Sequence, residues 1–345
     1  MMCLPDVADD GALGTIQHEC LSSEGGESDL QNYLAVCEKN PNHKGFISVK
    51  DFTVHHLPEG HRHHDLYEFI KATADLTVRV GVKMTSLKRP DVWPDKTGPY
   101  PFFELKGKTT FRCGSGELDI YEYKNGYGRD GHGHTEKAGF SYNSRYPTCP
   151  CDNCLHSDDA KTIWWEVVLT TAAHVVFDDI EAKHTTCKLF YDQTDSDVKI
   201  FDKFSLLYVD VNKDACALKF ITCDETLGKE LYALARRRAE LLEKVNSLYA
   251  IRVNDKWNFI VSYPHGCTKQ VSVGKSLSNV KISDYLLSKD YYYSRMTYNT
   301  CTCPGSSGAW IHLVGCPGAH VHRGADLQTG INFSSVGLYF REESP

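Results

Sequence analysis

The chain has 345 residues and a formal net charge of -7 at pH 7, and it contains no basic tract. This charge argues against nucleic acid as a main partner. No apolar run is long enough to span a membrane, and the first ten residues lack the basic start and apolar stretch of a signal peptide, so we expect a cytoplasmic protein with no membrane partner. The 14 cysteines are scattered, which in a reducing compartment favours free thiols or metal ligands over disulfides.

The first 75 residues are expected to lie outside the main β domains. Residues 1–28 are acidic, rich in Gly and Ser and poor in large apolar side chains, a composition that predicts a disordered tail. Residues 29–75 are predicted to form a helical extension, with helices at 29–37 and 65–74. A clean alternation of residues over 76–82 then predicts the first strand of a β domain that covers residues 76–223.

A segment rich in Cys and His, at 117–160, is predicted to be an insertion within this domain. It holds Cys149, Cys151, Cys154 and His156 within eight residues. Thiolates and imidazole suit tetrahedral Zn²⁺, so these four residues are the candidate ligands of a structural zinc. The spacing of Cys149 and Cys151 is tight for one tetrahedral site, and a redox-active thiol cluster is the alternative.

Residues 224–250 are predicted to form one long amphipathic helix that links two β domains. A capping signature at 222–225 precedes leucines at helical spacing from Leu227 to Leu248. The apolar stripe is expected to pack on the rest of the protein rather than to form a dimer contact, because Arg238 interrupts it. The arginines at 236–238 are interpreted as a solvated face, and a second β domain is expected at 251–345.

Three short segments carry residue types that could form a nucleophilic catalytic site. His174 follows the apolar run 164–170, at the point where a predicted strand gives way to small residues. Asp214 lies between two apolar runs that could bury it, and Asp210 is the competing carboxylate. Ser307 lies in a loop flanked by glycines, which allow a tight turn whose backbone N–H groups face one oxygen.

In this order, the three segments resemble the catalytic signatures of the trypsin/chymotrypsin family of serine proteases. They read Thr-Thr-Ala-Ala-His-Val at 170–175, Asp-Ala-Cys-Ala-Leu-Lys at 214–219 and Pro-Gly-Ser-Ser-Gly-Ala at 304–309. The order His, Asp, Ser distinguishes this lineage from other serine protease lineages. The resemblance spans residues from about 76 to 340. It implies a mostly β fold of two antiparallel six-stranded β-barrels, to which the helical extension and the long helix are additions.

The resemblance implies an intracellular serine endopeptidase that cleaves polypeptides through an acyl-enzyme and needs no cofactor for catalysis. His174 would be the general base, Asp214 the carboxylate that orients it and Ser307 the nucleophile. The backbone N–H groups of Gly305 and Ser307 would form the oxyanion hole. The alternative is a catalytically idle pseudoprotease that acts as a protein-binding module.

The resemblance also implies a substrate pocket. Cys301 stands at the position that resembles the base of the pocket, and the strand that contains His322, Arg323 and Gly324 resembles its wall. Cys301 is neither an acid that would select Lys or Arg nor a clearly apolar floor, so no cleavage preference follows from it. Ser306 stands where secreted members have an aspartate that pairs with a liberated N-terminus, so activation by that ion pair is not expected.

Overall fold

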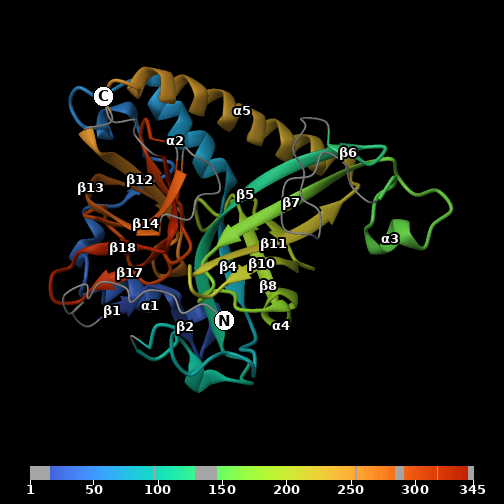
Figure 1. The fold of residues 1–345 in the computed structure, drawn as a ribbon, viewed down its shortest axis with the longest axis horizontal. Helices are drawn as coiled ribbons and strands as arrows, with labels where there is room; N and C mark the ends of the chain where they lie inside the picture. The colour runs from blue at the N-terminus through green and yellow to red at the C-terminus, as the bar shows by residue number, and fades with distance from the viewer. Residues whose placement is uncertain are drawn as a thin grey trace.

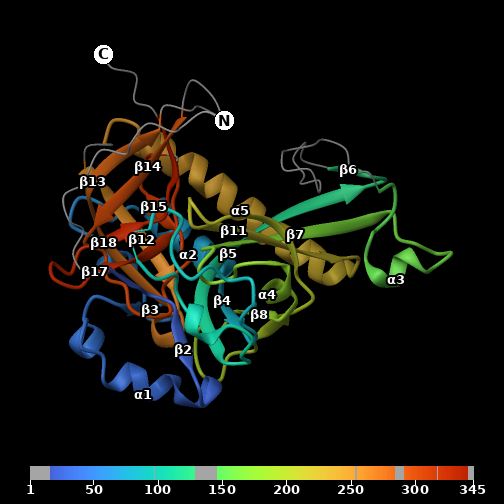
Figure 2. The same ribbon diagram turned by 60° about the horizontal axis from the view of Figure 1, so that its bottom comes forward.

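The computed structural model describes residues 16–96, 98–128, 146–252, 255–283, 291–316 and 318–340. The fold is mostly β, with two antiparallel sheets side by side and two long helices across them (Figures 1 and 2). This confirms the fold class expected from the sequence. Each sheet has more than six strands, because short strands from the N-terminal segment and from loops add to it.

The first sheet is built around the long strand pair β5 and β7, which the green ribbons show in Figure 1. Its strand order is β10 (Ser205–Asp210), β11 (Ala215–Thr222), β7 (Ile163–Thr171), β5 (Phe111–Lys124), β4 (Thr77–Val82), β8 (Thr185–Leu189) and β9 (Lys199–Phe201), while β2 (Leu21–Ser23) and β6 (Tyr127–Gly128) also pair with β5. Valines and leucines of β4, β5 and β7 fill one buried core. Burial of these β-branched and aliphatic side chains supplies most of the stabilisation of the sheet.

The second sheet contains the C-terminal third of the chain and two short strands from its N-terminal part. Its strand order is β1 (Ile16–His18), β17 (His322–Asp326), β18 (Asn332–Ser334), β14 (Tyr291–Tyr298), β13 (Gln270–Ser283), β12 (Trp257–Ser262) and β15 (Ile311–Leu313). In addition, β3 (Ile47–Ser48) pairs with β13, and β19 (Gly337–Phe340) pairs with both β14 and β16 (Gly318–Ala319).

Helices α2 (His64–Leu76) and α5 (Glu225–Tyr249) lie side by side across both sheets (Figure 1). Asp224 caps α5 by accepting hydrogen bonds from two backbone N–H groups of its first turn. Leu231 packs on the core of the first sheet, whereas Leu241 and Val245 pack with α2 on the core beneath the second sheet. The predicted long helix therefore holds the two sheets together.

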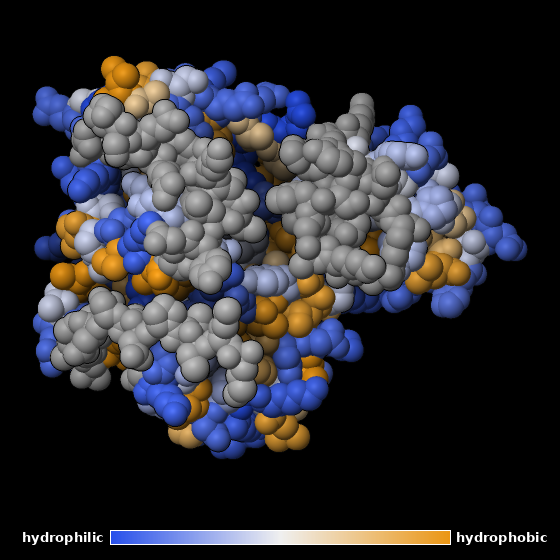
Figure 3. All heavy atoms as spheres, viewed as in Figure 1, coloured by the Kyte–Doolittle hydropathy of each residue, from blue (hydrophilic) through white to orange (hydrophobic). Residues whose placement is uncertain are grey.

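Short helices occupy the connecting segments. They are α1 (Leu30–Ala35), α3 (Asp152–Leu155) and α4 (Asp179–Lys183), with 3₁₀ turns η1 (Gly26–Asp29), η2 (Pro41–His43), η3 (Val54–His56), η4 (Phe103–Leu105) and η6 (Pro264–Gly266). None of the helices in the described ranges is both long and apolar enough to cross a membrane. On the face shown in Figure 3, apolar residues gather in several separate groups between polar ones.

The prediction of a disordered tail at 1–28 is wrong for residues 16–28. In this segment β1 pairs with β17 of the second sheet and β2 pairs with β5 of the first, and Glu19 and Cys20 between them are buried. Long-range strand pairing supplies the backbone hydrogen bonds that the local composition does not suggest. Residues 1–15 lie outside the described residues.

The predicted insertion at 117–160 begins later than expected. Strand β5 continues without a break to Lys124 and pairs with β7 over residues 117–124, so these residues belong to the sheet. Residues 129–145 lie outside the described residues, and the chain is described again from Tyr146 to the start of β7.

The interpretation of the three consecutive arginines as a solvated face is wrong for Arg238. Its side chain is only 14% exposed and pairs with Glu117 and Asp119 of β5 beneath α5, whereas the side chain of Arg236 is 57% exposed. Arg238, which interrupts the apolar stripe, therefore forms an ion-paired contact between the helix and the sheet.

We expect Arg238→Ala to lower the free energy of unfolding by about 3 kcal/mol, because it leaves the Glu117 carboxylate buried without this partner. Arg236→Ala is the matched control on the same helix and should change it by less than about 0.5 kcal/mol. Urea unfolding followed by circular dichroism measures both values. Equal effects of the two substitutions would contradict a stabilising role for the buried pair.

Candidate active site

His174, Asp214 and Ser307 lie together at the junction of the two sheets. The Nδ1 atom of His174 is 2.8 Å from Oδ2 of Asp214, and its Nε2 atom is 2.7 Å from Oγ of Ser307. All three residues are fully buried. His174 follows β7, Asp214 lies in the turn between β10 and β11, and Ser307 lies in the loop between β14 and β15. The first sheet therefore supplies the base and the acid, and the second supplies the hydroxyl.

The backbone at His174 is fixed by a buried cluster of charges. Nη2 of Arg89 donates to the carbonyl oxygen of His174 at 2.9 Å, and Nε of Arg89 donates to Glu181 at 2.8 Å. Glu181 also accepts from Arg112 at 2.9 Å. Burial by itself would raise the pKa of Glu181, but the charges of Arg112 and Arg89 outweigh burial and lower the pKa. Glu181 is thus an anion that holds two guanidinium groups under the turn.

Asp214 fixes both the ring and the backbone of His174. Its Oδ1 atom accepts a hydrogen bond from the backbone N–H of His174 at 2.9 Å. Burial would raise the pKa of Asp214, but the contact with His174 lowers it, so the carboxylate stays ionised. The competing carboxylate, Asp210, instead accepts hydrogen bonds from Tyr208 and from the backbone of Lys213. Among the described residues, Asp214 is therefore the carboxylate that orients the histidine.

Ser307 lies in a tight loop that directs two backbone N–H groups at one point. Gly305 and Gly308 have φ angles of +99° and +87°, a backbone conformation that residues with a side chain rarely adopt. The N–H groups of Gly305 and Ser307 both donate to the carbonyl oxygen of Glu19, at 2.6 and 3.1 Å. These are the two groups that the sequence suggested for an oxyanion hole.

Ser115, on β5, joins this loop to the first sheet. Its backbone N–H donates to the carbonyl of Ser307 at 2.8 Å, and its hydroxyl donates to the carbonyl of Gly305 at 2.9 Å. The same hydroxyl accepts from the backbone N–H of Tyr263 at 3.0 Å. No local pattern in the sequence distinguishes this residue.

The residues predicted to form the substrate pocket differ in where their side chains lie. His322 is buried in the pocket, where its Nε2 atom lies 2.6 Å from a carboxylate oxygen of Glu19. Gly324 pairs with His18 of β1, and a Cβ atom at this position would collide with the neighbouring strand. The side chain of Arg323 turns away from the pocket.

Arg323 and Cys301 make contacts that the resemblance to the protease family did not suggest. The guanidinium of Arg323 lies over the ring of Trp93 at 3.9 Å, and its Nε atom is 3.6 Å from Oδ2 of Asp214. The sulfur of Cys301 packs against Gly45 of the N-terminal extension. The extension therefore covers this sulfur on one side, and the expected place of Cys301 at the base of the pocket stays a prediction. Sequence reasoning missed Glu19, whose carboxylate lies against His322, and Lys39, which pairs with Glu19, because no local pattern distinguishes either residue.

Three of the predicted metal ligands come together with a cysteine from elsewhere. Cys149, Cys151, Cys154 and Cys223 place their sulfur atoms within 4.8 Å of one another. Sulfur–sulfur distances of 3.8 Å and 3.6 Å separate Cys223 from Cys151 and from Cys154. Two thiolates on one tetrahedral Zn²⁺ lie about 3.8 Å apart, given Zn–S bonds of about 2.3 Å. His156, in contrast, is exposed and outside this group, because it follows the short helix α3 on its solvent side.

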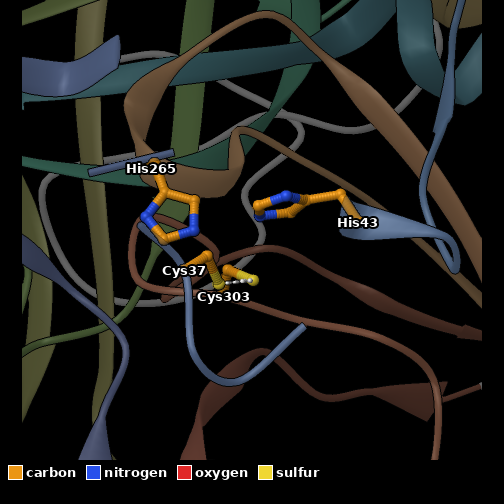
Figure 4. A group of neighbouring side chains, drawn as sticks. All are labelled: Cys37, His43, His265 and Cys303. Carbon is orange, nitrogen blue, oxygen red and sulfur yellow. Dashed lines mark hydrogen bonds between the residues drawn. The ribbon is translucent and has the colours of Figure 1, made fainter. Parts of the chain in front are cut away.

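A second group of metal-ligand side chains lies behind the loop of Ser307. It consists of Cys37, His43, His265 and Cys303, whose ligand atoms also lie within 4.8 Å of one another. In Figure 4 the two imidazole rings lie side by side, edge to face, above the two sulfur atoms, which the dashed line joins. Sequence reasoning missed this group, since its members come from three distant segments.

Comparisons with known proteins give weak likenesses only. A scan against protein-family models finds no match, and neither does a search of curated proteins. Among solved structures, the HtrA-type protease AlgW with a tripeptide is 11% identical, with coverage of 78% of this chain and 58% of AlgW and a TM-score of 0.36. Deg5 is 11% identical, with coverage of 81% of this chain and 91% of Deg5 and a TM-score of 0.37.

Proposed function

We propose that the protein is a serine endopeptidase of the trypsin/chymotrypsin kind, which cleaves polypeptides through an acyl-enzyme. The observation that carries the proposal is the chain of hydrogen bonds from Asp214 through His174 to Ser307, combined with two N–H groups that converge on one carbonyl oxygen. Acyl transfer to a serine requires this arrangement of a nucleophile, a base, a carboxylate that orients the base and an oxyanion site.

Each group has one role in the reaction. His174 Nε2 takes the proton as Ser307 Oγ attacks the substrate carbonyl carbon. The N–H groups of Gly305 and Ser307 stabilise the negative charge that develops on the carbonyl oxygen. His174 then gives its proton to the leaving amine, and the same steps with water release the acid and regenerate the hydroxyl. Asp214 stabilises the imidazolium that forms in each step.

The loop around Ser307 is ordered without the ion pair used by secreted members of the family. The hydroxyl of Ser306 accepts from the backbone of Cys303 at 3.2 Å and contacts the hydroxyl of Ser262 at 3.1 Å. Since Ser306 contacts the loop but not His174, the two adjacent serines give a matched pair for testing the nucleophile.

We expect Ser307→Ala to abolish labelling by a fluorophosphonate probe and to lower the rate of peptide cleavage by about 10⁶-fold, because no other hydroxyl hydrogen-bonds to His174 among the described residues. Ser306→Ala should keep its labelling. Labelling and peptide assays on the two purified variants measure this. Labelling that persists in Ser307→Ala would contradict the assignment, and a wild-type protein that never labels would favour the idle pseudoprotease.

The same proposal includes a structural zinc held by Cys149, Cys151, Cys154 and Cys223. The ion would tie the segment before β7 to the end of β11, because Cys223 directly follows that strand. Structural sites of this kind contribute on the order of 10 kcal/mol of apparent binding free energy in small peptides. A zinc here would therefore hold the far end of the first sheet, away from the triad.

We expect Cys223→Ser and Cys151→Ser each to remove about one equivalent of zinc from the purified protein and to lower its melting temperature. His156→Ala should leave both quantities unchanged. Elemental analysis and thermal unfolding of protein purified under reducing conditions without chelator measure them. Zinc that is lost with His156→Ala but kept with Cys223→Ser would restore the ligand set suggested by the sequence.

A further inference from the structure

The N-terminal segment runs through the active site as an extended chain. Ile16–His18 pairs antiparallel with β17 on one side of Ser307, and Leu21–Ser23 pairs antiparallel with β5 on the other. Glu19 and Cys20 connect the two strands and are buried. Figure 2 shows β2 close to β4 and β5, below the second sheet. A peptide substrate that bound across the junction of the two sheets would take this path.

The backbone of Glu19 makes the contacts expected of the residue whose carbonyl is attacked. Its N–H donates to the carbonyl oxygen of Arg323 at 3.3 Å. Its carbonyl oxygen accepts from the N–H groups of Gly305 and Ser307 at 2.6 and 3.1 Å. The two N–H groups of the proposed oxyanion site thus bind a carbonyl oxygen of this protein's own chain.

The side chain of Glu19 fills a pocket built for a carboxylate. One oxygen accepts from Nε2 of His322 at 2.6 Å, and the other accepts from Nζ of Lys39 at 2.5 Å. Lys39 is held in turn by Thr302 at 3.0 Å and Asn332 at 2.7 Å. The carboxylate is fully buried, so both its hydrogen bonds are shielded from water. They are charge-assisted because the acceptor is a carboxylate.

The charge of the pocket favours an anion. Burial would raise the pKa of Glu19, but the hydrogen bond from His322 and the charge of Lys39 lower it to about 2. A lysine or arginine in the same place would face the ammonium of Lys39, and a glutamine would lose the ionic part of both contacts. The pocket therefore discriminates between side chains mainly by charge.

The residues on either side of Glu19 are also seated. The ring of His18 stacks on Trp93 and lies edge-on to His174, with ring centroids 5.1 and 5.2 Å apart respectively. The thiol of Cys20 donates to the carbonyl of Cys113 at 3.2 Å. Both sides of the Glu19–Cys20 bond are therefore positioned on the protein before any reaction.

We propose that this pocket selects glutamate at the position before the cleaved bond, and that the Glu19–Cys20 bond is the enzyme's own first substrate; this rests on the serine protease activity proposed above. Ser307 Oγ forms a bond to the carbonyl carbon of Glu19, the bond to the nitrogen of Cys20 breaks, and His174 passes its proton to that nitrogen. Water then hydrolyses the ester. The products are a peptide that ends in the Glu19 carboxylate and a chain that begins at the Cys20 amine.

Intact-mass analysis of the purified full chain tests the self-cleavage. The wild-type protein is expected to yield a chain that begins at Cys20, whereas Ser307→Ala and Glu19→Ala should stay uncut between these residues. Glu24→Ala alters an exposed glutamate five residues away and should be cut as the wild type is. A wild-type chain that labels with fluorophosphonate yet stays intact at Glu19 would overturn self-cleavage and leave the segment as an uncut inhibitory strap.

Peptide cleavage in trans tests the pocket separately. A peptide with the sequence of residues 14–23 should be cleaved after its glutamate, with kcat/KM at least about 100-fold above that of the same peptide with glutamine there. Lys39→Met should reduce this ratio, mainly through KM, and Lys44→Met, which alters an exposed lysine of the same segment, should not. Fluorophosphonate labelling without a glutamate preference would overturn the pocket but keep the protease. Absence of labelling would overturn the protease itself.

A separate observation concerns the group of Cys37, His43, His265 and Cys303. The two sulfur atoms are 3.6 Å apart, far beyond a disulfide bond and close to the spacing of about 3.8 Å for two thiolates on one Zn²⁺. Within the described part of the chain, neither ring nitrogen of His265 has a hydrogen-bond partner, and the same holds for Nε2 of His43, although all three atoms are buried. Buried imidazole nitrogens without partners are costly, so their convergence on two thiols indicates a missing ligand.

The surroundings of this group also fit bound thiolates. The side-chain amide of Asn40 donates to the sulfur of Cys303 at 3.2 Å, and its backbone N–H donates to the sulfur of Cys37 at 3.5 Å. Such N–H donors stabilise the negative charge of coordinated sulfur. His43 and His265 have φ angles of +50° and +55°, a conformation that is held only where the surroundings require it.

We infer that Cys37, His43, His265 and Cys303 form a tetrahedral zinc site. It would link the N-terminal extension, the turn before β13 and the loop of Ser307. The ion would bind one ring nitrogen of each histidine and so supply the partner that two of the three ring nitrogens lack, and two thiolates would balance its charge.

Zinc analysis on the Ser307→Ala background, which stays intact, tests this site. Cys37→Ser and His43→Gln should each remove about one equivalent of zinc and leave the zinc of the four-cysteine group in place. His55→Gln, at an exposed histidine, should remove none. Cobalt(II) added to the chelator-treated protein should give the absorption of mixed sulfur and nitrogen ligands, which Cys37→Ser abolishes. Unchanged zinc in both variants, or a Cys37–Cys303 disulfide in protein purified with reductant, would overturn the inference.

Discussion

The contact that Ser115 makes between the two sheets determines whether the triad can exist. His174 and Asp214 belong to the first sheet and Ser307 to the second, so their alignment is only as good as the docking of the sheets. Ser115 binds the nucleophile loop at two carbonyls, and its neighbour Gly114 has no room for a Cβ atom, which would lie 2.8 Å from the carbonyl of Ser307. A misplacement of about 1 Å between nucleophile and base costs roughly 100-fold in rate. Gly114 is therefore required by the close approach of the two sheets.

The buried arginines beneath His174 serve the same alignment from the other side. Charges taken out of water destabilise a fold unless they are paired and hydrogen-bonded. Arg89 and Arg112 share the carboxylate of Glu181, and Arg89 donates its remaining hydrogen bonds to backbone carbonyls that include that of His174. The pairing limits the cost of burial, and the geometry of the guanidinium fixes the turn. The charge cluster thus contributes to the position of the imidazole more than to the stability of the core.

The sequence could predict what depends on local pattern. The alternation at 76–82 predicted a strand that is now β4, the leucine spacing at 227–248 predicted α5, and the three short motifs named the residues that meet at the junction of the sheets. Contacts between distant segments could not be predicted. Cys223 joins the thiols near Cys151 only because β11 lies beside β7.

The error at 16–28 has the same origin as the omission of the pocket. Composition describes a segment by itself, and this segment is polar, so it resembles a disordered tail. Its order comes from pairing with strands about 90 and 300 residues away in the chain, together with the ion pair of Glu19 and Lys39. A buried glutamate in a polar segment is informative only once its partners are known. Sequence patterns identify the proposed catalytic residues because their roles require a motif, whereas the contacts of Glu19 involve residues that no motif links.

Residues 37–43 join substrate selection to the nucleophile loop. Lys39 reaches the carboxylate of Glu19, and on either side of it Cys37 and His43 contribute to the group that includes Cys303. The backbone N–H of His265, the fourth member of the group, donates to the carbonyl of Pro304 at 2.5 Å, two residues before Ser306. A long lysine side chain loses considerable conformational entropy when it is held in one place. Because the backbone is anchored on both sides of Lys39, less conformational entropy remains to be lost when Lys39 binds a substrate carboxylate. The charge that we propose to select glutamate is therefore carried by a segment whose position is coupled to the loop of Ser307.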